Sequence, residues 1–499
     1  MKFSRWTLRS AVAVTAGLAV AAGLPAGLAA AQSKAGGPMV KLVVAQKSVN
    51  VPLYGKRVYL DTGVYVTAVG SPLQFDVQRA SYAKPITITQ LIRGPGGQVT
   101  RRPLPAWTLA RNWSGLHRFF RMTVKNLSGK IVASDVGPFC PDNYSPQRSG
   151  PNSPPRSPFP QQCASDPFQL SNVWGIQRGW GVDLGGLAPR LRLGKYVVTI
   201  TITRTWQRFL HLTPRAATAT VNIKVVKPTQ CVFPCPARQA TQRPVSSKVL
   251  PRLPANVPTL SSPPASSLPD LVPLPSYGIR VERVRVSKTS TLEQLTFGAT
   301  VWIGGQSRLD VEGFRSHGSP VMKAYQYFWK NGRIIGRARA GTMGFDSKPG
   351  HDHWHFEQFA QYRLLNSSRS TVVRSQKVGF CIAPTDGVNL LLPHALWQPT
   401  FTGFGGACGT PSALWVQEEL PLGWGDTYFQ YLPGQSFSLK NLPNGTYYIE
   451  IIANPEKVLH ETNLSNDVSL RKIILGGTPD HRTVTVPAVH GIDPEHQKG

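Results

Sequence analysis

Acidic residues are scarce in this chain of 499 residues: 25 Asp and Glu stand against 55 Lys and Arg, and the formal net charge is +30. A surplus of positive charge of this size favours anionic partners, such as nucleic acid, acidic protein or an anionic cell-wall polymer. The arginines are scattered along the chain, and no stripe of alternating basic and aromatic residues occurs. We therefore expect no nucleic-acid partner, and an anionic cell-wall polymer remains a candidate.

Long hydrophobic runs are missing beyond the N-terminus. Residues 1–31 combine the cations Lys2, Arg5 and Arg9 with a short apolar run and small residues at 29–31, which is typical of a secretory signal peptide. No later stretch approaches the ~20 apolar residues that a membrane-spanning helix needs. The sequence thus predicts a secreted, extracellular protein with no transmembrane span, whose mature chain begins near Gln32.

Helical periodicity is missing as well, whereas the chain contains 46 Gly and 44 Pro residues. Alternating β-branched and aromatic runs occur at 196–206 and 217–226. The Asn-Gly pair inside 324–340 separates two further β-rich runs and indicates a hairpin. The expected fold class is all-β, with two β-sandwich-like domains.

Cysteine is limited to six residues. An even number of cysteines in an exported protein indicates disulfide bonds. The spacing favours three local pairs in sequence order, although six cysteines allow 15 pairings. The six residues are Cys140, Cys163, Cys231, Cys235, Cys381 and Cys408.

The composition changes at residues 229–267, which are rich in Pro and Ser and lack apolar periodicity. Such a stretch is typical of a semi-extended linker. We predict an N-terminal β domain without catalytic residues at 38–228, a second β domain at 268–478 and a flexible tail at 479–499.

The two predicted domains share a sequence frame. Residues 113–140 and 354–381 both run from Trp to Phe-Cys over 27 positions. Each is followed by a second Cys, a Gly-Trp-Gly and a Gly-x-Tyr, in the same order. We infer a degenerate duplication. Residues present in both halves are then structural candidates, and residues confined to the second half are functional candidates.

Histidine is rare too, yet three of the eleven histidines are His351, His353 and His355. Alternate residues of a strand point to one face, so this spacing can present three imidazoles together, provided that the strand bends after the preceding Pro-Gly. Neutral imidazoles suit copper, zinc, iron or nickel, and copper(II) leads the affinity order for nitrogen donors. The alternative is a chance cluster on an exposed strand. The counterparts of the three histidines in the first half are Ala110, Asn112 and Ser114.

Five ordered motifs in residues 268–476 resemble the lysyl oxidase family, the copper-dependent protein-lysine 6-oxidases. They are "LPDLVP" (268–273), "HDHWHFEQFAQYRLL" (351–365), "SQKVGFCIAPTD" (375–386), "GWGDTYFQYLPGQSFSLKNLPNGTYYIEIIANP" (423–455) and "HETNLSNDV" (460–468). The second motif resembles the family's copper segment, the third its lysine-bearing strand, and the fourth its Asp-Thr-Tyr segment. The resemblance implies that 268–478 is a lysyl-oxidase-like catalytic domain.

The resemblance also implies a cofactor, lysine tyrosylquinone, formed from Lys377 and Tyr428, with Cu²⁺ bound by the three histidines. In the family, the quinone condenses with a primary amine such as peptidyl lysine, and acts as an electron sink. O₂ then yields the aldehyde, NH₃ and H₂O₂. Asp426 is close to Tyr428 in sequence, but the sequence gives it no role. One departure is Gln361, which stands where the animal domain has a further histidine.

Two other functions fit the same residues. A secreted copper-binding β-sandwich protein without a quinone needs only the histidines. An adhesion module whose basic charge binds cell-wall polymers needs neither copper nor Lys377 and Tyr428. The amine oxidase hypothesis differs from both because it requires Lys377 and Tyr428 to lie close together.

Overall fold

The chain folds almost entirely into β-strands, as expected from its alternating apolar and polar runs. The computed structural model describes residues 39–94, 96–110, 113–142, 146–164, 166–227, 256–285, 291–316, 318–347, 352–375, 377, 379–399 and 408–496. Pro38–Gly499 groups into one unit. Helix is limited, among the described residues, to α1 (Arg204–Phe209) and the 3₁₀ turns η1 (Ala106–Thr108) and η2 (Ala265–Ser267).

The first half of the chain contains three sheets. The first has the order β1 (Val40–Val44), β4 (Val64–Ala68), β12 (Trp180–Asp183), β10 (Gln147–Arg148). The second has the order β11 (Ser171–Ile176), β5 (Leu73–Gln78), β6 (Thr87–Arg93), β7 (Val99–Leu104). The third has the order β3 (Arg57–Val58), β2 (Ser48–Tyr54), β14 (Thr218–Val226), β13 (Gly194–Ile202), β8 (Leu116–Asn126), β9 (Ile131–Phe139).

The second half also contains three sheets. The first has the order β15 (Pro269–Pro273), β17 (Thr291–Gly305), β26 (Trp424–Tyr428), β24 (Asp386–Gly387), and β17 also pairs with β16 (Tyr277–Arg285) and β27 (Ser436–Ser438). The second has the order β21 (His353–Phe356), β20 (Arg333–Asp346), β19 (Val321–Lys330), β18 (Leu309–Phe314), β25 (Trp415–Leu420). The third has the order β23 (Thr371–Arg374), β22 (Ala360–Leu365), β28 (Gly445–Ala453), β29 (Val468–Thr478), β30 (His481–Thr485).

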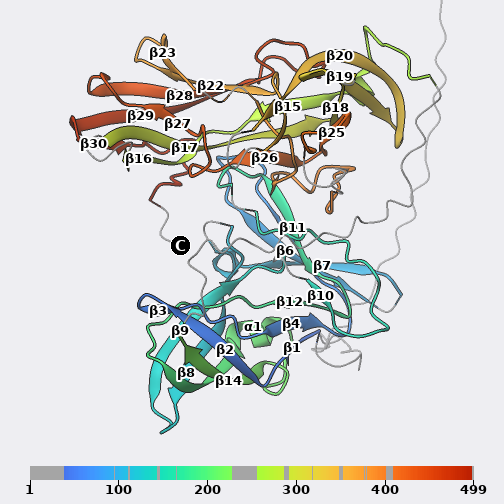
Figure 1. Cartoon of the computed structure of the whole chain (residues 1–499). Helices are drawn as coiled ribbons and strands as arrows, with labels where there is room; N and C mark the ends of the chain where they lie inside the picture. Colours follow the sequence, from blue (N-terminus) through green and yellow to red (C-terminus); the bar gives the residue numbers. More distant parts are fainter. Residues whose placement is uncertain are drawn as a thin grey trace, which may run out of the picture. The chain divides into compact units, whose positions relative to one another are not determined.

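The two halves repeat one antiparallel arrangement. The order β1-β4-β12-β10 matches β15-β17-β26-β24, β11-β5-β6-β7 matches β25-β18-β19-β20, and β9-β8-β13-β14 matches β23-β22-β28-β29. In Figure 1 the last pair can be followed at β8 and β14 in the first half and at β22, β28 and β29 in the second. The predictions of an all-β fold and of a duplication are confirmed.

Residues that occur in both halves are buried, hydrogen-bonded or disulfide-bonded in the same way in each half. Trp113 and Trp354 are fully buried. The hydroxyls of Tyr196 and Tyr447 each donate a hydrogen bond to the carbonyl oxygen four residues earlier in the chain, at 2.9 and 2.7 Å. The disulfides Cys140–Cys163 and Cys381–Cys408 occupy equivalent places. Two of the predicted local disulfides are thereby confirmed, and the pair Cys231–Cys235 lies outside the described residues.

Each half has its own hydrophobic core. The core of the first half is formed by buried residues between Val40 and Val225. The core of the second half is formed by buried residues between Leu271 and Val486, joined by Phe159 and Val173 from the first half. The sheets cover these cores on both sides, as in β-sandwiches.

The predicted semi-extended linker and the predicted flexible tail both have described parts that pack against the second half. In the linker, Pro258 and Leu260 pair with Arg337 of β20, where the Leu260 N–H donates to the Arg337 carbonyl at 2.8 Å. The C-terminal segment forms β30, buries Val486 and Ile492, and presents the Glu495 carboxylate to the Ile279 N–H at 3.0 Å. Apolar residues at alternate positions in 484–486 account for this packing, because one side of the segment can enter the core.

Candidate functional site

The histidine segment forms strand β21, the edge strand beside β20. His353 and His355 occupy alternate positions, with ring centroids 4.5 Å apart. His353 is half-buried, and His355 is 6 % exposed. His351 lies outside the described residues. The strand therefore brings together the two described imidazoles, as the alternate spacing predicts.

The spacing of these two rings suits a shared metal ion. Rings at this separation of 4.5 Å could both reach one metal ion, because a metal–nitrogen bond is ~2 Å long. Within the described residues, no group of three or more His, Cys, Asp or Glu side chains is arranged to hold a metal.

Lys377 lies next to Tyr428. The Lys377 ammonium nitrogen, Nζ, is 4.0 Å from the centroid of the Tyr428 ring and 4.9 Å from that of Phe380. The side chain is 7 % exposed, and burial lowers the pKa of its amine from 10.5 to about 8, against the opposing charges of Asp426 and Asp346. Lys377 is thus an amine with a lowered pKa that faces an aromatic ring.

The backbone around Lys377 fixes the direction of its side chain. The Lys377 N–H donates to Ser375 Oγ at 3.0 Å, and the Ser375 hydroxyl donates to the Gly434 carbonyl at 3.1 Å. Gly434 has a positive φ of +83°, and a Cβ there would lie 3.1 Å from the Lys377 Cβ. Only glycine combines this conformation with this closeness, so Gly434 allows Lys377 to enter the core.

Tyr428 ends strand β26, and its ring is held on two sides. Its hydroxyl accepts from the Cys381 N–H at 2.9 Å and donates to the Cys381 carbonyl at 3.1 Å. The Phe380 ring meets the Tyr428 ring edge-on, with centroids 5.2 Å apart. Burial raises the pKa of the phenol well above 10, and the nearby Asp426 carboxylate adds to this effect. The hydroxyl therefore stays protonated at neutral pH.

Asp426 lies on the same face of β26 as Tyr428, because alternate residues of a strand share a face. Its side chain is 3 % exposed, and Oδ2 has no hydrogen-bond partner among the described residues. Burial raises the pKa of this carboxyl well above 3.8, and the charge of Lys377 opposes that rise. The sequence alone assigned no role to Asp426. Asp426 and Tyr428 are, however, two residues apart on one strand, and this spacing could have indicated that they share a face.

One extended segment connects the histidines to the cofactor candidates. Phe356 of β21 and Phe380 exchange backbone hydrogen bonds of 2.8 and 3.0 Å. Gly379 lies against His355, because a Cβ on Gly379 would be 2.7 Å from the Cβ of His355. Asp346, whose charge acts on the Lys377 amine, pairs across β20 and β21 with His353.

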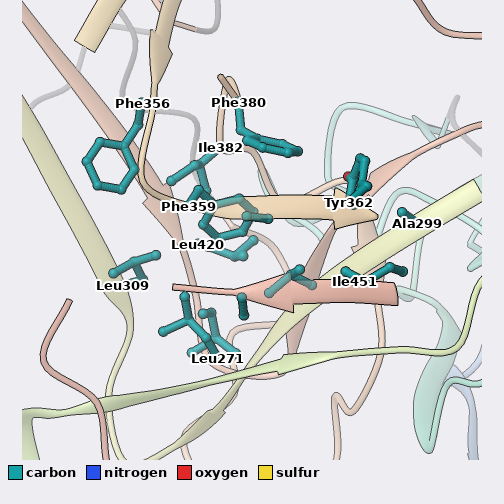
Figure 2. Close-up of a cluster of buried hydrophobic side chains, with 14 of the residues drawn as sticks. Leu271, Ala299, Leu309, Phe356, Phe359, Tyr362, Phe380, Ile382, Leu420 and Ile451 are labelled. Carbon is teal, nitrogen blue, oxygen red and sulfur yellow. The ribbon is translucent and has the colours of Figure 1, made fainter. Parts of the chain in front are cut away.

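Aromatic packing encloses this region from the core side. Figure 2 shows Phe356, Phe359 and Phe380 in one buried cluster with Tyr362 and Leu420. The Phe380 ring meets the Tyr362 ring edge-on, with centroids 5.6 Å apart. Bulk water is excluded from the side of Phe380 that faces this cluster, so charges beside it interact more strongly than they do in water.

A second buried carboxylate, Glu418 of β25, adds to the negative charge near Tyr428. Its Oε2 accepts from the Ile382 N–H at 3.0 Å, and its Oε1 has no partner among the described residues. Burial raises the pKa of Glu418 well above 4.5. Glu418 lies two residues from both Val416 and Leu420 and shares their buried face of β25, so this spacing could have indicated its burial.

The first half lacks a lysine and a tyrosine equivalent to Lys377 and Tyr428. The counterpart of Lys377 is Val136 of β9, and the counterpart of Tyr428 is Leu184, which is buried in the core of that half.

Gln361, the departure from the lysyl oxidase pattern, accepts hydrogen bonds from the Arg363 guanidinium at 3.0 and 2.8 Å.

No helix in the described part of the chain has the length and apolar character needed to cross a bilayer.

Comparisons with known proteins add no assignment. No family model matches the chain, and no curated protein matches it. Among solved structures, the chain is compared with the tetra-tandem repeat in the extending region of a large adhesion protein, at 9 % identity and a TM-score of 0.10, covering 87 % of this chain and 100 % of that one. This likeness is too low to carry an argument about fold or function.

Proposed function

We propose that this chain is an exported copper-dependent amine oxidase whose cofactor, lysine tyrosylquinone, forms from Lys377 and Tyr428. The observation that supports the proposal best is the 4.0 Å between Lys377 Nζ and the centroid of the Tyr428 ring. These residues are 51 positions apart in sequence (428 − 377), and the amine is buried beside two aromatic rings although burial disfavours its charge. His353 and His355, together with His351, are the proposed copper ligands.

The quinone supplies an electrophile that no standard side chain offers and that accepts electrons from the amine. The net reaction converts R–CH₂–NH₂, O₂ and H₂O into R–CHO, NH₃ and H₂O₂. The substrate class is a primary amine, including peptidyl lysine. Asp426 Oδ2 is the proposed proton acceptor for the Lys377 ammonium, because only the neutral amine can bond to the ring of Tyr428.

Three features of the chain support these roles. Burial brings the pKa of Lys377 to about 8, so an appreciable fraction of the amine is neutral at physiological pH. Phe380 and the Cys381 backbone hold the Tyr428 ring in a fixed orientation. The backbone pairing of Phe356 with Phe380 joins the histidine strand to the lysine segment.

Mass spectrometry of the copper-loaded protein tests the proposal. After trapping with phenylhydrazine and digestion, we expect one peptide that joins Lys377 to Tyr428 and carries the hydrazine. Lys377→Met and Tyr428→Phe should both lose it. Tyr447→Phe is the matched control, because Tyr447 is also buried and also donates its hydroxyl to a backbone carbonyl, and it should keep the cross-link.

A copper-loaded protein with unmodified Lys377 and Tyr428 would contradict the proposal. Bound copper without the cross-link would then favour a secreted copper-binding β-sandwich protein, the second candidate. That function would need only the histidines as nitrogen ligands for the metal.

A further inference from the structure

We propose that the outward face of the sheet β3-β2-β14-β13-β8-β9 binds a hydroxyl-rich, phosphate-bearing polymer. This sheet belongs to the first half, which has no counterpart of the proposed active site. Figure 1 shows β2, β14 and β8 in one layer of that half. The inference does not depend on the proposed oxidase activity.

The sheet has one apolar face and one polar face. Side chains alternate strictly along β14, where Val221, Ile223 and Val225 are buried and the intervening residues are exposed. The same alternation on β13 and β8 sends Ile200 and Val124 into the core. The outward positions are Arg57 on β3, Ser48, Asn50, Pro52 and Tyr54 on β2, Thr218, Thr220, Asn222 and Lys224 on β14, Lys195, Val197, Thr199 and Thr201 on β13, Arg121, Thr123 and Lys125 on β8, and Ile131, Ser134 and Val136 on β9.

The strand register arranges these side chains in rows. Thr123, Thr199 and Thr220 are direct neighbours across three strands, and form a band of hydroxyls. Lys195 and Lys224 are paired directly across β13 and β14, so their Cα atoms are separated by about one strand spacing of ~4.8 Å. Two like charges placed directly opposite destabilise a sheet. A bound anion would remove this repulsion between Lys195 and Lys224, so the pairing indicates an anion-binding surface.

Positive charge surrounds the hydroxyl band and is not balanced within it. Lys125 and Arg121 lie on β8, four residues or about 13 Å apart along the strand. No acidic residue occupies an outward position. Asp135 of β9 pairs with Met122, whose side chain is buried, so it does not belong to the outward rows.

This combination favours a phosphate-bearing polyol or sugar polymer. Ammonium and guanidinium groups attract repeated phosphates, and threonine hydroxyls both donate to and accept from ligand hydroxyls. Single-stranded nucleic acid is a poorer fit, because its bases stack on exposed aromatic rings, and Tyr54 at the end of β2 is the one aromatic side chain among the outward positions. The chain's net charge of +30 strengthens the attraction at long range.

Binding of the full-length protein to immobilised poly(glycerol phosphate) tests the proposal, with uncharged dextran as the blank. The test variant is Lys125→Thr/Lys195→Thr/Lys224→Thr, which keeps residues that favour strands. The matched control carries three Lys→Thr changes at exposed strand positions of the second half. These positions are Lys323, Lys330 and Lys472.

Both variants lose three positive charges, so they differ only in where the charge is removed. We expect the test variant to bind at least about tenfold more weakly and with a shallower dependence on salt, as expected when fewer phosphates are neutralised. The control should bind within about twofold of the parent, since only the net charge has changed. Equal melting temperatures for the three proteins would show that the fold is retained.

Two outcomes would overturn the proposal. Equal weakening in the two variants would assign the binding to net charge alone. Competition by double-stranded DNA at equal phosphate concentration, lost in the test variant only, would assign the face to nucleic acid. Activity on a small amine is independent of either outcome, because none of these lysines belongs to the proposed active site.

Discussion

Burial of the Lys377 amine has a cost that can be measured without any activity assay. The pKa falls from 10.5 to about 8 on folding, and this difference of about 2.5 corresponds to about 3 kcal/mol at ~1.4 kcal/mol for each pKa unit. Below pH 8 the lysine is charged in both the folded and the unfolded chain, so the folded state bears the whole cost. Above pH 10.5 the amine is neutral in both states, and the cost disappears.

Replacing Lys377 by Met removes the charge and keeps the length of the side chain. We therefore expect Lys377→Met to raise the free energy of unfolding of the copper-free protein by about 2–3 kcal/mol at pH 7. The gain should shrink as the pH rises above 8, because the parent protein is stabilised by losing its buried proton. Urea denaturation at pH 7 and at pH 9.5 measures both values.

Lys330→Met is the control, because Lys330 is exposed at the end of β19, and it should change stability by less than about 0.5 kcal/mol at either pH. The reasoning is refuted if Lys377→Met is no more stable than the parent protein at pH 7. It is also refuted if the gain is the same at pH 9.5 as at pH 7, since the gain would then come from packing and not from charge.

Four further changes have defined outcomes. Tyr428→Phe should abolish phenylhydrazine labelling and cost about 1–3 kcal/mol in urea denaturation, because the buried Cys381 N–H loses its acceptor. Asp426→Asn should lower the midpoint of the pH profile for cross-linking below 8, since the carboxylate raises the pKa of Lys377. The same change should slow cross-linking at the plateau of the profile at least about tenfold, because the proton acceptor is lost. An unchanged plateau would leave Asp426 with an electrostatic role alone. Trp354→Ala should cost about 3–5 kcal/mol by calorimetry, because the ring is fully buried. Replacing both Cys381 and Cys408 by Ser should cost about 3–4 kcal/mol, as expected for a loop of 27 residues, and a smaller loss would indicate residual structure in the reduced unfolded chain.

Local pattern was sufficient to predict the fold class and the duplication. Trp113 and Trp354, the Phe-Cys pairs and the Gly-x-Tyr strands occur in the same order in both halves, and each pair has the same structural task in both halves. Alternating runs such as 217–226 predicted strands because one face is buried and the other solvated. The C-terminal segment was missed, since its few apolar residues give a short and weak pattern.

The candidate site was predictable only in part. The spacing of His353 and His355 indicates a shared strand face, because that relation is local. The approach of Lys377 to Tyr428 joins a residue that lies beyond the end of β23 to the last residue of β26, and no strand periodicity indicates it. It was expected only from the resemblance to lysyl oxidases. The burial of Asp426 and Glu418 was not predicted, because a carboxylate at an alternate strand position normally faces solvent.

The disulfide Cys381–Cys408 lies entirely within the span from Lys377 to Tyr428. If those two residues join, the chain contains one covalent ring inside another, and the outer ring encloses 51 residues (428 − 377). Closing a loop of that length restricts the unfolded chain by about 4 kcal/mol. Formation of the cross-link would then raise the melting temperature, and this increase would persist after the copper has been removed by a chelator.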